Sequence, residues 1–370
     1  MARDKLESEL LIIGAHELSK EKQYKFVRQL PKCQGAVAKY RRNEEHRLIS
    51  PGEMIPLAER QDLLRRIFEA NSIPLDETGP IDVYNPAIVV GPNGEVEFLG
   101  RAEARKTKFS TLIVHFRLLG EAWIPQGKFA FQLEDPAVAY IDDQIIVAGV
   151  ELKKDFRTAS ADYKTVFYKG TSLDNLERLK AEGPLGMKDI RFVKLANGKI
   201  GVYTRPQTLK GGLEGQIGFT IIDSLADLNA QVIRDAPLIN ARFPTGEWGG
   251  VNQAQLLPDG RILVLGHRAY RDEKKARHYF PWAFVHDPVT GEIQDLGILA
   301  ESADFPSGVA KAWDLRDVLF SAGFILEGDR LTLYTGTRDT EAGKIVIGNF
   351  KIPPRLPNAR LRREPIHLEN

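Results

Sequence analysis

The stretch FQLEDPAVAYIDDQIIVAGVE, Phe131–Glu151, contains two short apolar runs on either side of a tight acidic turn. Both runs are rich in β-prone residues, and Asp142-Asp143 separates them, so the pattern predicts a β-hairpin. The strands of a hairpin are antiparallel. Asp135 at its start and Glu151 at its finish should therefore lie at the same end of the hairpin.

The same pattern occurs five times along the chain. Its first and last positions are 16 residues apart in every copy, at 85 and 101, 135 and 151, 189 and 205, 252 and 268, and 322 and 338, and they are polar except at Ala322. Polar turns at 93–94, 142–143, 197–198, 259–260 and 328–329 divide the copies. Successive copies start 50, 54, 63 and 70 residues apart, and repeats of antiparallel strands at about such a period are typical of propeller blades. The sequence therefore predicts an all-β fold, a five-bladed β-propeller.

The repeats also predict how the 370 residues are divided. Residues 1–79 lie outside them and are expected to form an N-terminal extension that packs on the propeller or closes it. This extension should contain one helix over 56–71, PLAERQDLLRRIFEAN, whose apolar residues fall on one face. Segments 10–13 and 35–40 are candidate closing strands. The propeller is expected over 80–355, with a C-terminal surface tail over 356–370.

Composition narrows the class of protein. The net charge of +1 gives no overall field that would attract nucleic acid or an anionic membrane. The single cysteine, Cys33, excludes an internal disulfide framework, and no apolar run is long enough to span a bilayer. The N-terminus lacks the pattern of a signal peptide. We therefore expect a cytoplasmic protein, and the sequence does not indicate an oligomeric state.

A propeller would bring the ends of the five copies together. The innermost strands of its blades line one channel, and their equivalent ends meet at one face. We therefore expect a single polar pocket that contains both acids and bases. Its expected members are Asn85, Arg101, Glu103, Glu134, Asp135, Glu151, Lys188, Asp189, Arg205, Asn252, His267, Arg268, Arg338 and Asp339.

Asp135 is the main candidate for catalysis. The apolar neighbours Phe131, Leu133 and Val138 would raise its pKa, and a carboxyl with a raised pKa can serve as a general acid. In the alternative interpretation, Asp135-Pro136 only starts a turn. The repeat favours the catalytic interpretation because it places Asp135 among basic groups.

Those basic groups form a second candidate set. Arginine forks and lysine ammonium groups bind phosphate or carboxylate oxygens. The set comprises Lys188, Arg205, His267, Arg268 and Arg338. In the alternative interpretation, they form structural ion pairs with Glu103, Glu151, Asp189 and Asp339. Metal binding is not expected, because no His-x-x-x-His or cysteine pair occurs.

The sequence also contains three aromatic residues and a glycine pair whose roles it does not decide. Trp248, Trp313 and Tyr203 could stack on a sugar ring or pack in the core. Gly249-Gly250 is interpreted as a pair of loop glycines near the fourth copy.

Several segments resemble motifs of the five-bladed inverting β-mannoside phosphorylases. The matching segments are Glu134-Asp135-Pro136, Lys188-Asp189 with Arg191-Phe192, Gly198-Lys199, Tyr203 with Arg205-Pro206, Leu265-Gly266-His267, Asp317-Val318 with Phe320, and Tyr334 with Gly336 and Arg338-Asp339. The chain is most similar to the bifunctional β-1,2-mannosyltransferase/phosphorylase branch. It departs from the usual pattern at Ala137, Thr204 and Arg268.

This resemblance implies a reaction. Phosphate would attack the anomeric carbon of a β-1,2-linked oligomannoside and give α-mannose 1-phosphate with inversion. Asp135 would be the general acid, and Lys188, Arg205, His267 and Arg268 would hold phosphate. Residues expected to contact the oligosaccharide are Asn85, Arg101, Glu103, Glu134, Glu151, Asp189, Asn252, Arg338 and Asp339. No cofactor is implied beyond phosphate as co-substrate, or a nucleotide-linked mannose in the transferase direction.

Two other functions compete with this one. An inverting hydrolase needs a second carboxylate roughly 6.5–9.5 Å from the acid to activate water, and Glu151 could supply it. Alternatively, the protein could be a non-catalytic sugar-binding propeller in which the charges are structural.

Overall fold

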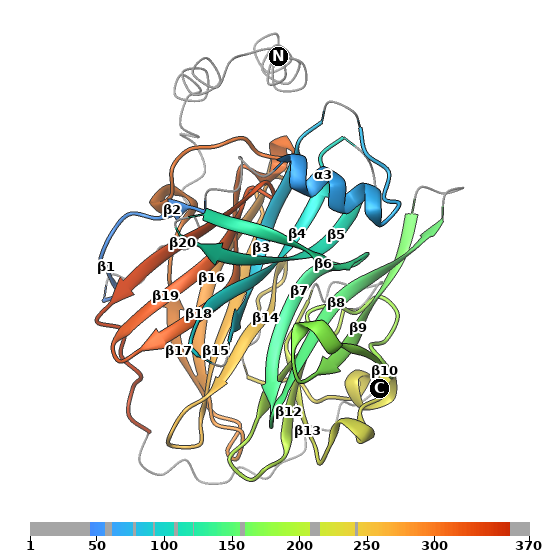
Figure 1. The fold of residues 1–370 in the computed structure, drawn as a ribbon. Helices are drawn as coiled ribbons and strands as arrows, with labels where there is room; N and C mark the ends of the chain where they lie inside the picture. Colours follow the sequence, from blue (N-terminus) through green and yellow to red (C-terminus); the bar gives the residue numbers. More distant parts are fainter. Residues whose placement is uncertain are drawn as a thin grey trace.

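The structure is a computed structural model of the 370-residue chain (Figure 1). It describes residues 45–55, 61–76, 79–91, 93–106, 110–120, 122–155, 160–207, 215–240 and 243–355. The candidate closing strands at 10–13 and 35–40, Cys33 and the expected tail over 356–370 lie outside these ranges. Within them, no helix has both the length and the apolar character needed to cross a bilayer.

The strands form five successive antiparallel groups, as the five copies of the hairpin pattern predict. The first is β3 (Ile81–Val90), β4 (Val96–Ala104), β5 (Thr111–Leu119) and β6 (Ala122–Phe131). The second is β7 (Glu134–Ile141), β8 (Gln144–Asp155), β9 (Ser160–Gly170) and β10 (Glu177–Glu182). The third is β11 (Arg191–Lys194), β12 (Ile200–Thr204) and β13 (Gly218–Ile222). The fourth is β14 (Glu247–Leu256), β15 (Ile262–Arg271), β16 (Arg277–His286) and β17 (Ile293–Ile298). The fifth is β18 (Asp317–Glu327), β19 (Arg330–Thr337) and β20 (Glu341–Gly348).

The first two strands of each group are the predicted hairpins. All five turns contain a residue in the left-handed region, which tight hairpin turns require. These residues are Gly94, Asp142, Gly198, Gly260 and Gly328. Glycine and aspartate accept this conformation at low cost, so the five hairpins are confirmed at the positions that the turn signals gave.

The first strands of the groups contact one another in sequence. β3 contacts β7, β7 contacts β11, β11 contacts β14, β14 contacts β18, and β18 contacts β3. These contacts run through all five groups and return to the first one. A short parallel pairing of β16 with β18, at His278–Asp317 and Tyr279–Val318, also joins the fourth and fifth groups into one sheet.

The described parts of the segment before residue 80 pack on these groups. β1 (Arg47–Leu48) and β2 (Glu53–Met54) both pair with β20, on the outer side of the fifth group (Figure 1). Helix α3 (Gln61–Ala70) lies beside the first group. It buries Leu64, Ile67 and Phe68 in the same apolar cluster as Phe98 and Phe116.

The helix predicted over 56–71 is largely confirmed. Its described part begins at Gln61, since residues 56–60 lie outside the described ranges. Leu63, which was expected on the apolar face, is 38% exposed. The other short helical elements join strands. They are η2 (Leu173–Asn175), η3 (Leu225–Asp227), α4 (Ala230–Arg234), η4 (Ser302–Asp304) and η5 (Trp313–Leu315).

Candidate functional site

The first residue of each of the first four repeat copies departs from regular strand geometry. Asn85, Asp135 and Asp189 have φ angles of 52°, 48° and 59°. Strand register shifts at Asn85, Asp135 and Asn252, between residues 84 and 87, 134 and 137, and 251 and 253. A β-bulge redirects a side chain, and Asn and Asp tolerate the left-handed region better than most residues. Asn85, Asp135 and Asn252 are therefore at bulges that turn their side chains out of the strand pairing, whereas Asp189 lies just before β11.

Asp135 lies among three donors that come from distant parts of the sequence. Nη1 of Arg101 is 3.0 Å from Oδ1 of Asp135, and Nζ of Lys188 is 3.2 Å from Oδ2. Nδ2 of Asn85 donates to Oδ1 over 3.3 Å. The three donors come from the first group and from the segment before β11. We call Asn85, Arg101, Glu103, Glu134, Asp135 and Lys188 the acid cluster.

Arg101 connects Asp135 to the other acids of this cluster. Its Nη2 is 2.7 Å from Oε1 of Glu134 and 2.9 Å from Oε2 of Glu103. Glu103 also accepts from Tyr84 Oη over 2.5 Å and from Lys311 Nζ over 2.5 Å. Sequence reasoning missed Tyr84 and Lys311. Lys311 lies in the connection between β17 and β18, outside the repeat, and no pattern in the sequence assigns it to this cluster.

Asp189 organises a second set of charges. Its Oδ2 is 2.8 Å from Nη1 of Arg205, and its Oδ1 is 3.3 Å from Nη2 of Arg191. Arg205 Nε also donates to Gly249 O over 2.7 Å, and Arg191 Nε donates to Asn252 O over 2.9 Å. These guanidinium groups are buried and fix β11 against β14. We call Asp189, Arg191, Arg205, Asn252 and His267 the arginine cluster.

His267 lies at the edge of the arginine cluster. Its Nδ1 is 2.9 Å from Oδ1 of Asn252, and its ring stacks on Tyr279 with centroids 5.5 Å apart. Burial lowers the pKa of His267 to about 3, more than the nearby Asp189 raises it. A neutral imidazole can exchange one hydrogen bond with a ligand but adds no positive charge. The expectation that His267 is one of the cations of the site is therefore wrong, and its predicted contact with phosphate would be a hydrogen bond rather than an ion pair.

Backbone packing joins the two clusters. Gly249 and Gly250, which were expected in a loop, lie within β14. A Cβ atom at Gly250 would be 3.0 Å from Arg205 and 3.1 Å from both Asp189 and His267. The absence of a side chain at Gly250 therefore leaves room for the three groups to approach one another without displacement. Lys188 precedes Asp189 directly, so the two clusters form one continuous polar region.

The charges around Asp135 reverse its expected behaviour. Burial alone would raise the pKa of this carboxyl, but Lys188 and Arg101 outweigh burial and hold its pKa well below the usual range. The prediction of a raised pKa at Asp135 is therefore wrong for the substrate-free protein, in which Asp135 is a carboxylate. Burial does raise the pKa of its neighbour Glu134 and of Asp339.

The fifth group contributes Asp339 to the polar region. It follows Arg338, and both residues have left-handed φ angles, 55° and 57°. The charges of Arg101, Lys311 and Asp135 all act on the pKa of Asp339, so its carboxyl lies near the acid cluster. It has no hydrogen bond or ion pair with another described residue. Arg338 and Asp339 form the hairpin turn between β19 and β20, and this turn holds the Asp339 carboxyl beside the acid cluster.

Three expected members of the pocket have their side chains elsewhere. Glu151 pairs with Arg178 at 2.6 Å on the face of the second group. Arg268 lies over the ring of Trp282, 4.3 Å from its centroid, because neighbours in a strand point to opposite sides and His267 takes the inner one. Arg338 donates to Pro306 O over 2.8 Å. In this structure all three side chains are therefore engaged outside the acid and arginine clusters, and the roles expected of Glu151 and Arg338 toward the sugar and of Arg268 toward phosphate stay predictions.

The three candidate stacking residues also differ. Tyr203 and Trp248 are buried, at 0% and 6% exposure, and pack in the core. Trp313 is 54% exposed. Among the described residues, no group of three or more His, Cys, Asp and Glu side chains is suited to a metal ion.

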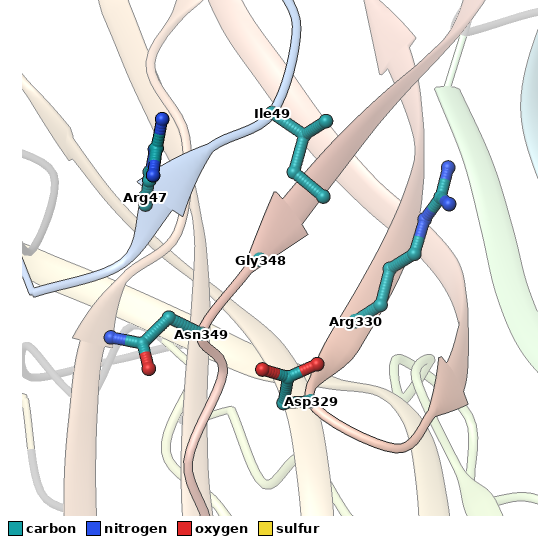
Figure 2. A pocket seen from close by; sticks show the side chains of 6 residues that line it. All are labelled: Arg47, Ile49, Asp329, Arg330, Gly348 and Asn349. Carbon is teal, nitrogen blue, oxygen red and sulfur yellow. The ribbon is translucent and has the colours of Figure 1, made fainter.

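A surface pocket lies away from this polar region. Figure 2 shows the residues that line it, namely Arg47, Ile49, Asp329, Arg330, Gly348 and Asn349. Arg330 begins β19, whereas Arg338 and Asp339 follow the other end of the same strand. The pocket and the polar region are therefore at opposite ends of the fifth group.

Comparisons with known proteins identify the family to which the chain is similar. A family model described as "Protein of unknown function (DUF1861)" matches residues 59–351. MPT-4, a mannose phosphorylase from Leishmania mexicana with a structure in complex with phosphate ion, is 32% identical, with 79% of this chain and 93% of that chain covered and a TM-score of 0.67. MPT-1, a GDP-Man-dependent mannosyltransferase from the same organism, is 34% identical, with 72% and 85% covered and a TM-score of 0.66.

A more distant structure shares the fold. The β-1,2-mannobiose phosphorylase from Listeria innocua is 18% identical, with 75% of this chain and 92% of that chain covered and a TM-score of 0.54. A comparison with curated protein sequences gave no match.

Proposed function

Because the chain belongs to the family of mannoside phosphorylases and mannosyltransferases that includes MPT-4 and MPT-1, we propose that it is an inverting β-1,2-mannoside phosphorylase. Its substrates are a β-1,2-linked oligomannoside and inorganic phosphate, and its product is α-mannose 1-phosphate. We further propose that the five strand groups are the blades of a five-bladed β-propeller. The closed circuit of contacts among β3, β7, β11, β14 and β18 supports this arrangement.

The contact between Lys188 and Asp135 carries the proposal. A carboxylate that can exchange a proton with a sugar oxygen lies 3.2 Å from an ammonium group whose side chain is 36% exposed. Phosphorolysis needs both, a proton for the leaving sugar and a cation for the attacking phosphate. Arg205 is buried against Asp189 and Gly249, so Lys188 is the cation best placed to meet an anion.

The proposed reaction breaks the glycosidic bond as a phosphate oxygen bonds to the anomeric carbon from the opposite face. The oxygen of the departing sugar takes the proton of Asp135, through a sugar hydroxyl as the family resemblance implies. In the substrate-free protein Asp135 is ionised. Phosphate that binds Lys188 offsets one of the two cations beside Asp135 and adds negative charge, and both effects favour the protonated carboxyl.

Hydrolysis is less compatible with these side chains. Glu151, the candidate base, pairs with Arg178 and Lys164 on the face of the second group. It is therefore engaged away from Asp135. Transfer from a nucleotide-linked mannose remains a second candidate, because MPT-1 is as similar to the chain as MPT-4 is.

One set of incubations separates these functions. The protein is mixed with β-1,2-mannobiose with and without phosphate, and in parallel with mannobiose and GDP-mannose. Phosphate-dependent mannose 1-phosphate is the expected result. Free mannose released without phosphate would instead identify a hydrolase. Longer oligomannosides formed only in the incubation with GDP-mannose would identify a transferase. No product in any incubation would indicate a binding protein.

A further inference from the structure

The four tryptophans of the chain differ sharply in exposure. Trp123, Trp248 and Trp282 are 9%, 6% and 1% exposed, whereas Trp313 is 54% exposed. Trp313 makes no ring contact with another described residue. A single exposed aromatic residue is unremarkable by itself, so its significance depends on what surrounds it.

The segment that carries Trp313 is fixed to the polar region at several points. Lys311 N donates to Arg338 O over 3.1 Å, beside Asp339. Lys311 Nζ reaches Glu103 in the acid cluster. After Trp313, Asp314 accepts from Arg277 Nε over 2.8 Å, and the charge of Arg277 also acts on the pKa of Asp339. Trp313 therefore lies between two anchored residues at the rim of the site.

The backbone also gives the direction of the ring. Ala312 is extended, with φ −144° and ψ 160°, and side chains on the two sides of an extended residue leave the chain on the same side. Trp313 therefore starts on the side of Lys311, which points into the acid cluster. Leu315, two residues further, is buried and faces the protein. The indole ring is therefore exposed to solvent on the side of the backbone from which Lys311 reaches the acid cluster.

We propose that Trp313 is a stacking platform for the sugar unit on the leaving-group side of the cleaved bond, which is the acceptor in the synthetic direction. The proposal rests on the proposed function. The apolar face of a pyranose ring packs well on an indole ring, and the hydroxyl groups at its edge stay in water. The mannose unit whose anomeric carbon is attacked must lie at the acid cluster. The indole ring of Trp313 is therefore placed for the neighbouring sugar unit.

Intrinsic fluorescence tests the stacking without any turnover. Because Trp313 is the exposed tryptophan, titration with β-1,2-mannobiose should change the emission of the wild-type protein, and this change should vanish in Trp313→Phe. Mannose 1-phosphate alone should cause little change at Trp313. The same change in Trp313→Phe as in the wild type, or no change in the wild type, would overturn the proposal.

Kinetics in the synthetic direction give a second test. Trp313→Ala should raise the KM for the acceptor about 5-fold and leave the KM for mannose 1-phosphate unchanged, since stacking of this kind contributes on the order of 1 kcal/mol. Val289→Ala is the matched control, because Val289 is a 73% exposed apolar residue beyond the far end of β16. Equal acceptor KM values in wild type and Trp313→Ala would contradict the proposal.

The outcomes also separate this inference from the function. Emission that responds to mannobiose without any phosphate ester being formed would support the platform and reject the phosphorylase. Formation of mannose 1-phosphate without a response of the emission to mannobiose would support the phosphorylase and reject the platform.

Discussion

Lys188 Nζ and Asp135 Oδ2 lie 3.2 Å apart, although 53 residues separate them in the sequence. The pair links the second group of strands to the third. It also sets the protonation state of Asp135, because burial alone would have raised the pKa of this carboxyl and the two cations beside it reverse the shift. A phosphate ion that competes for Lys188 would therefore act on the same carboxyl that must protonate the leaving sugar.

Asp135→Asn should abolish phosphorolysis and leave the fold intact. Asparagine is nearly isosteric and accepts the left-handed conformation of residue 135, but it cannot donate the proton of a carboxylic acid. Rates of mannose 1-phosphate release, with circular dichroism to check folding, measure the effect. A variant that keeps a near-normal rate would reject Asp135 as the acid.

The same substitution should lower stability in a pH-dependent way. The pKa of Asp135 is depressed in the folded state, so its ion pairs stabilise the protein above the unfolded pKa of about 4. That stabilisation is lost as the pH falls through this value and below it. We expect the variant to be about 2 kcal/mol less stable at pH 7, and the difference to shrink below pH 4. Denaturant titrations at both pH values would detect it, and a constant difference would contradict the ionised state.

Lys188→Met should raise the KM for phosphate at least 10-fold, because the ammonium group is the exposed cation of the acid cluster. Lys194→Met is the control. Lys194 pairs with the exposed Asp142 at a hairpin turn, and its side chain is 32% exposed, close to that of Lys188. If both variants have the same phosphate KM as the wild type, Lys188 does not bind phosphate.

Gly336→Ala should lower activity by displacing Asn85, although Gly336 itself lies in β19. A Cβ atom at Gly336 would lie 1.9 Å from Asn85 Oδ1 and 2.9 Å from Asn85 N, so Asn85 must move away from Asp135. Gly79→Ala is the matched control, since its nearest neighbours would be at 3.5 Å, an ordinary contact. Activity should fall at least 10-fold in the first variant only. Equal activities would show that the position of Asn85 is unimportant.

His267 should make the protein less stable in mild acid. Its pKa is about 3 in the folded protein and about 6.5 when unfolded, so the unfolded state binds more protons between these values. Stability therefore falls as the pH falls from 6.5 towards 3, by about 2 kcal/mol between pH 7 and pH 5. His267→Gln lacks this loss, and the stability gap between wild type and variant should narrow at pH 5. A gap that stays constant would mean that His267 titrates normally.

The sequence was sufficient to predict the five hairpins, because their turns and apolar runs are local signals. The spacing of 16 residues also led to Asn85, Asp135, Lys188 and Asp189. Contacts that depend on which way a side chain leaves its strand could not be predicted. Arg268 and His267 are adjacent, and only their alternation in β15 sends one to Trp282 and the other to the site.

Electrostatic behaviour was harder still to predict. The apolar neighbours of Asp135 suggested a raised pKa, but Arg101 and Lys188 are 34 and 53 residues away in the sequence and decide the result. Lys311 is even more remote from Tyr84, by 227 residues, and belongs to no repeat. Such residues become visible only once the chain is folded.

The position of a bound oxyanion tests the account most directly. A crystal soaked with phosphate should show the ion in contact with Lys188 Nζ, within reach of the His267 ring and beside Asp135. Phosphate bound only in the surface pocket of Arg47 and Arg330, with Lys188 still paired to Asp135, would contradict the account.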